Sequence, residues 1–165
     1  MSDLAAEFIA RLDRVADRLH RHATTQFPDG ALTAPDPPTG ERWEVGQVWA
    51  HLAEFIPYWL GEAALVMRGN GEPVPFGRTK TDPGRVAAIE RDRRDDRVAL
   101  WNRVQGDIVS LRAFLEGFTE ASWSARGLHP AMGEMDLGKL IDEFLVGHLE
   151  QHADQLDGLA AASTG

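Results

Sequence analysis

Three histidines have the residue type and the spacing of a metal site. His148 and His152 are four residues apart, so on an α-helix their imidazoles lie on one face and can bind the same ion. His51 lies in an earlier apolar stretch and can supply a third ligand from a second helix. Three neutral imidazoles leave positions on a metal open for water or substrate, as catalytic sites do.

The alternative for each histidine is a core residue satisfied by a hydrogen bond. His148 follows Phe144 by four residues and His152 precedes Leu156 by four, so both lie in the apolar stripe of their helix. Burying several imidazoles is costly unless a shared partner satisfies them. On spacing alone, a metal site and a packed core are about equally supported.

Two other metal motifs do not fit the same residues. A zincin peptidase needs glutamate directly after the first histidine, where this chain has Leu149. Di-iron bundles use paired Glu-x-x-His motifs, which the sequence lacks. The sequence therefore favours neither a peptidase nor a ferritin-like oxidase.

Three further residues are candidates for supporting the site or contacting a substrate. Gln155 lies on the same helical face as His148 and His152, where it can orient a ligand or contact a substrate. The alternative interpretation is a polar residue at the mouth of the bundle with no role in the site. Glu54 can accept a hydrogen bond from His51, although a surface glutamate is the commoner case. His129 precedes the last helix and can reach the mouth of the site, with an exposed loop histidine as the alternative.

The apolar periodicity predicts the helices that must position these residues. Apolar residues recur at spacings of three and four, and the third helical segment is open to division into a short first helix and a longer one. Asp136 is expected to cap the last helix. The expected helices span residues 3–25, 45–68, 86–116 and 137–161.

Long irregular connections separate these helices, at residues 27–40, 69–84 and 118–136, where proline and glycine interrupt the pattern. We find no convincing alternating strand pattern. The fold class expected is all-α, a four-helix bundle with long crossover loops that forms a single domain over residues 1–165.

Composition limits the partners. A net charge of −9 opposes binding to nucleic acid or to anionic membranes, because phosphate binding requires clusters of Lys and Arg. The absence of cysteine removes disulfides and thiolate ligands and suits the cytoplasm, and no signal peptide or membrane span is expected. Only Lys80 and Lys139 are lysines and alanine is abundant, which indicates a GC-rich, actinobacterial type of genome.

Three segments together resemble the DinB-like (YfiT-like) superfamily of metalloenzymes. They are Trp49-Ala50-His51-Leu52, the loop from Gly127 to Glu134, and the segment from Gly147 to Leu156 that contains His-Leu-Glu-Gln-His. The resemblance spans nearly the whole chain. It implies a four-helix bundle with long crossovers, a divalent metal held by His51, His148 and His152, and a homodimer.

The same resemblance implies an enzyme related to bacterial thiol transferases and mycothiol-dependent maleylpyruvate isomerases. The isomerases often have glutamate where this chain has His148, so their substrate is not carried over. A metal activates a bound thiol, which the cysteine-free chain must take from a cofactor.

We therefore expect transfer of a low-molecular-weight thiol, such as mycothiol, to an electrophilic small molecule. The metal expected is Zn or Ni, with Fe or Cu also suited to three imidazoles. Two alternatives stay open, a metal-dependent hydrolase that uses water and a non-catalytic binding or stress protein.

Overall fold

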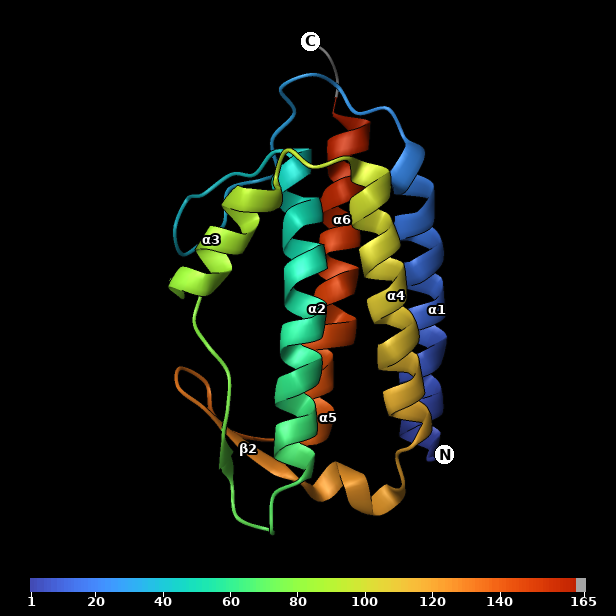
Figure 1. The fold of residues 1–165 in the computed structure, drawn as a ribbon, viewed down its shortest axis with the longest axis vertical. Coiled ribbons are helices and arrows are strands. Elements are labelled where there is room, and N and C mark those ends of the chain that lie inside the picture. The colour runs from blue at the N-terminus through green and yellow to red at the C-terminus, as the bar shows by residue number, and fades with distance from the viewer. Residues whose placement is uncertain (163–165) are drawn as a thin grey trace.

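Four long helical segments form a bundle in the computed structural model, which describes residues 1–162 (Figure 1). The fourth segment is composite, because a π-helical turn joins α5 to α6. The predicted all-α four-helix bundle is confirmed. The bounds are Asp3–Thr24 for α1, Val45–Met67 for α2, Arg97–Glu116 for α4, Leu137–Ile141 for α5, Asp142–Val146 for the π turn and Gly147–Ala161 for α6.

The helix order explains why the connections are long. Both α4 and α6 pack against α1 and against α2, so α1 and α2 lie diagonally across the bundle. The loop between them crosses one end of the bundle, as expected for residues 27–40 (Figure 1). Helices α2 and α4 run in the same direction, so the chain between them must return along the length of the bundle (Figure 1).

Helix α1 shows how local sequence produces these elements. The Ser2 hydroxyl accepts a hydrogen bond from the Ala5 N–H and caps the first turn. Leu12 and Leu19 are fully buried on the inward face. Burying each leucine stabilises the bundle by roughly 1.5–3 kcal/mol, so the apolar stripe fixes which face of α1 turns inward.

The return segment contains a separate helix, α3 (Pro83–Asp92), which packs on α2. The sequence left open whether residues 86–116 are one helix or two, and the structure has two. Asp82 caps α3 and Asp96 caps α4, each through its side chain. The chain turns at residues 93–95, after α3 ends, and Asp96 then begins the second helix.

Three short strands correct the expectation of purely irregular connections. They are β1 (Val74–Pro75), β2 (Arg126–His129) and β3 (Gly133–Asp136). Strand β2 pairs parallel with β1 and antiparallel with β3. With four residues or fewer, these strands are too short to show a period of two in the sequence. They hold the return segment against the loop that precedes α5.

The sequence predicted one continuous helix over residues 137–161. The structure instead has two α-helices joined by a π turn. The π turn lies directly before the segment that contains His148 and His152. Gly147 fits here because a Cβ at this position would lie 2.4 Å from the Asp142 carbonyl oxygen. The predicted cap is confirmed, since Asp136 Oδ1 accepts a hydrogen bond from the Lys139 N–H.

Within residues 1–162, no helix combines the length and the apolar character needed to cross a membrane.

Candidate metal centre

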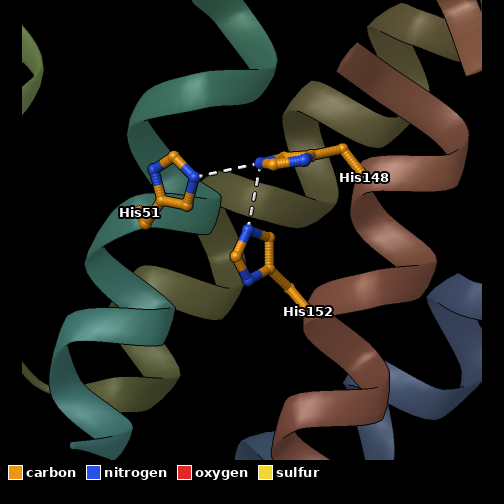
Figure 2. A group of neighbouring side chains, drawn as sticks. All are labelled: His51, His148 and His152. Carbon is orange, nitrogen blue, oxygen red and sulfur yellow. Dashed lines mark hydrogen bonds between the residues drawn. The ribbon is translucent and has the colours of Figure 1, made fainter. Parts of the chain in front are cut away.

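Helices α2 and α6 bring the three histidines together, as the sequence predicted. Figure 2 shows the His51 ring, from α2, facing the His148 and His152 rings, from α6. Nε2 of His148 lies 3.1 Å from Nε2 of His51 and 3.0 Å from Nε2 of His152. One nitrogen from each ring lies within 4.8 Å of the other two, so the three nitrogens surround one position that a single ion could occupy.

Two neighbouring side chains set the orientation of the outer rings. Nδ1 of His51 lies 2.7 Å from Glu54 Oε1, and Nδ1 of His152 lies 2.7 Å from Gln155 Oε1. A carboxylate and an amide oxygen only accept hydrogen bonds, so each Nδ1 carries the proton. The free lone pair of each ring is therefore on Nε2, which faces the other histidines.

This arrangement fits a metal ion better than it fits a packed core. Nε2 of His51 and Nε2 of His152 both face Nε2 of His148, which carries at most one proton. At least one buried acceptor therefore lacks a donor, which is unfavourable unless a cation supplies the interaction. Nitrogen ligands about 2.0–2.1 Å from a tetrahedral Zn²⁺ lie about 3.3 Å apart, close to the 3.1 and 3.0 Å that separate Nε2 of His148 from the other two Nε2 atoms.

Burial keeps the histidines neutral, which is the form that binds metal. Desolvation lowers the pKa of His51 and of His148 well below 6.5, and neighbouring positive charges lower it further. Burial also lowers the pKa of His152 to about 4, although the hydrogen bond with Gln155 opposes the shift. The three rings are therefore neutral near neutral pH.

Glu54 is buried, so the alternative of a surface glutamate is wrong. Its side chain is only 6% exposed, and it lies between Nδ1 of His51 and the guanidinium of Arg78, 2.5 Å away. Burial raises the pKa of Glu54, and the hydrogen bond with Arg78 opposes that shift. Arg78 thus keeps a buried carboxylate charged and directed at His51.

His129 is buried in β2, so the alternative interpretation of an exposed loop histidine is wrong. Its Nδ1 accepts hydrogen bonds from the N–H groups of Ala131 and Met132. Its Nε2 therefore donates to the Arg78 carbonyl oxygen, 3.1 Å away. His129 does not contact the three-histidine cluster directly, but it anchors the loop that places Arg78 beside Glu54.

The cluster opens into a cavity of about 610 Å³, a size suited to a small molecule. The Trp43 ring lies nearly parallel to the His152 ring and edge-on to the His51 ring, with centroids 6.2 and 5.2 Å away. On another wall the rings of Trp59 and Phe144 stack 4.1 Å apart. The site therefore has an apolar, aromatic lining next to its nitrogen ligands.

The sequence did not identify several residues of this cavity. Trp43 has the sequence pattern of a core aromatic. Arg78 and Lys80 lie in an irregular segment without periodicity, and Arg85 lies in the first turn of α3. The only signal was the length of that loop, since long connections are often functional.

Comparison with known families and structures agrees with this architecture. The model of the DinB superfamily matches residues 11–156, which is most of the chain. No match to the chain was found among curated proteins.

Three solved structures share the fold. YfiT from Bacillus subtilis, described as a probable metal-dependent hydrolase with an unusual four-helix bundle topology, has a TM-score of 0.74 and 20% identity over 97% of this chain and 88% of its own. A mutant of the mycothiol-dependent maleylpyruvate isomerase has a TM-score of 0.67 and 14% identity over 94% of this chain and 63% of its own. The colibactin self-resistance protein ClbS, in complex with double-stranded DNA, has a TM-score of 0.66 and 18% identity over 97% of both chains.

Proposed function

Because the chain belongs to the DinB superfamily and gathers three histidines at one point, we propose that it is a metal-dependent enzyme that transfers a small thiol to an electrophile. His51, His148 and His152 are the proposed ligands, and Zn²⁺ or Ni²⁺ the proposed ion. The observation that carries the proposal is the convergence of three Nε2 atoms, with the outer two Nδ1 atoms already bonded to Glu54 and Gln155.

A divalent ion held by the three histidines would supply the chemistry of lowering the pKa of a thiol or water. The protein supplies the rest of the site. Glu54 and Gln155 hold the two outer rings with their lone pairs inward, and Trp43 covers the edge of the cluster. The aromatic wall of Trp59 and Phe144 displaces water beside the reacting groups, which strengthens electrostatic interactions there.

Transfer of a thiol is favoured by composition and by the cavity. The chain has no cysteine, so a sulfur nucleophile must come from a bound molecule. A cavity of about 610 Å³ has room for such a molecule and a small electrophile together. The mycothiol dependence of one structural relative supports testing mycothiol first.

The test is metal-dependent formation of a thioether conjugate. Protein loaded with Zn²⁺ or Ni²⁺ is incubated with mycothiol and other bacterial thiols, with 1-chloro-2,4-dinitrobenzene as the electrophile, and the conjugate is followed by absorbance. We expect turnover that disappears in the His148→Ala variant and persists in the His20→Ala variant, because His20 lies outside the cavity. Absence of metal-dependent turnover with every thiol would refute thiol transfer.

Hydrolysis is the second candidate, supported by the description of YfiT as a probable metal-dependent hydrolase. The same three ligands serve water as well as a thiol. Consumption of 4-nitrophenyl acetate without added thiol, dependent on metal and on His148, would favour hydrolysis over transfer.

A further inference from the structure

The segment between β1 and α3, together with the first turn of α3, contributes a cationic wall to the cavity beside the histidines. Arg78, Lys80 and Arg85 all line the cavity. Arg78 pairs with Glu54, and Lys80 pairs with Asp36 at 2.9 Å. In the part of the chain that the structure describes, no carboxylate forms an ion pair with Arg85.

Arg85 uses few of its hydrogen-bond donors within the protein. Nη1 donates to the Lys80 carbonyl oxygen, 2.9 Å away, and the guanidinium lies over the Trp43 ring, 5.5 Å from its centroid. A guanidinium has five N–H donors, and the hydrogen bonds of the described residues engage only one of them. Burial lowers the pKa of Arg85, and the carboxylates of Glu54 and Glu41 offset this only at longer range.

Arg85 and the histidine cluster are connected through a single aromatic ring. The Trp43 ring contacts the Arg85 guanidinium, and the same ring lies edge-on to His51 and parallel to His152. A small molecule can therefore place one end at the histidines and the other at Arg85. A planar guanidinium binds carboxylate or phosphate with two parallel hydrogen bonds.

The acidic residues that line the cavity are Asp36, Glu41 and Glu143, and among the described residues none of them forms an ion pair with Arg85. Asp36 is occupied by Lys80 and by the hydroxyl of Thr39. Glu143 belongs to the π turn of the fourth segment, on a different element from α3. A partly buried cation without a paired anion favours an anionic ligand, because the ligand restores the interactions lost on burial.

We propose that Arg85 binds the anionic group of the molecule that reacts at the three-histidine cluster. The substrate class is then a small organic acid, carried either by the thiol or by its electrophilic partner. This inference rests on the proposed metal site. It adds a specificity-determining residue and an acidic substrate class to the proposed function.

The test measures binding at the metal without requiring turnover. Protein loaded with Co²⁺ is titrated with mercaptoacetate, 3-mercaptopropionate and 4-mercaptobutyrate and with the corresponding amides, and the thiolate-to-cobalt absorption band gives each Kd. Succinate monohydroxamate and its amide provide a second pair, because hydroxamates bind metals without thiol chemistry. A preference in the thiol pairs places the anion on the thiol, and a preference only in the hydroxamate pair places it on the electrophile.

We expect at least one acid to bind about tenfold more tightly than its amide, as one charge-assisted hydrogen bond requires. Arg85→Gln should remove this preference and Arg85→Lys should retain part of it. Arg94→Gln is the matched control, since it removes the same charge from an exposed position outside this cavity. Arg94→Gln should leave the preference unchanged.

Each failure has a distinct signature. Equal binding of every acid and its amide, or a preference that survives Arg85→Gln, would overturn the role of Arg85. A cobalt spectrum that no thiol changes would overturn thiol transfer, while the hydroxamate pair would still test Arg85. Failure of the protein to bind Co²⁺, Zn²⁺ or Ni²⁺ would overturn the metal site and both proposals with it.

Discussion

Replacing Glu54 with glutamine tests the arrangement of the metal centre most directly. The side chain is 6% exposed and accepts hydrogen bonds from both His51 and Arg78. An amide presents one acceptor and one donor group, so it cannot accept from both partners. If its NH₂ faces Arg78, two donors oppose each other. If its NH₂ faces His51, the ring must carry its proton on Nε2, where it blocks the metal.

Either orientation weakens metal binding in Glu54→Gln. Opposing donors or a changed tautomer cost about 1–3 kcal/mol, the penalty for a buried polar group left unsatisfied. Loss of a hydrogen-bond partner behind a metal ligand typically weakens affinity about 10- to 100-fold, which corresponds to roughly 1.4–2.8 kcal/mol. The two estimates agree. We expect the Kd for Zn²⁺ to rise within that range.

Competition with a chromophoric chelator gives the Kd of the metal-free protein for Zn²⁺. Glu150→Gln is the matched control, because Glu150 lies between His148 and His152 in sequence but pairs with Arg11 outside the cluster. Its Kd should stay within about twofold of the wild-type value. Thermal melts followed by circular dichroism verify that both variants fold. Wild-type affinity in Glu54→Gln, or equal losses in both variants, would refute the reasoning.

Three further outcomes are expected. Gln155→Leu should weaken Zn²⁺ binding less than Glu54→Gln does in the same titration, because a neutral hydrogen bond to His152 is lost instead of a charged one. The metal-free protein should lose about 2 kcal/mol of stability from His152 alone as the pH falls from 7 to 5, because the pKa of His152 is about 4 in the folded state and 6.5 in the unfolded state. Urea midpoints that do not change with pH would contradict this. Gly77→Ala should lower the melting temperature by several degrees and Gly61→Ala should not, because Gly77 has φ +90° and a Cβ there would lie 2.5 Å from His129 Cδ2, whereas Gly61 has open space.

Three predictions from the sequence remain open. The comparison with ClbS, which was solved with double-stranded DNA, means that the predicted absence of nucleic-acid binding needs its own measurement. The net charge of −9 still argues against it on electrostatic grounds. The homodimer and the cytoplasmic location likewise stay predictions.

Helical periodicity was the reliable signal in this sequence. The apolar stripe of α1 and the capping Asp136 are local features, and they appear in the structure where the sequence predicted them. The strands β2 and β3 were missed because each has only four residues and depends on pairing with its neighbour. The π turn before His148 was missed because it spans only five residues, too few for its shift of the helical phase to stand out in the apolar pattern.

The sequence by itself determined that His148 and His152 share one helical face, because the α-helical repeat places residues four apart on the same side. It also determined that the chain has no cysteine thiol of its own to act as a nucleophile. Only the tertiary structure decided that His51 joins that pair, because the packing of α2 on α6 sets their distance. It also decided that Arg85, in the first turn of α3, lines the same cavity, because the placement of that helix depends on long-range contacts that no sequence period encodes.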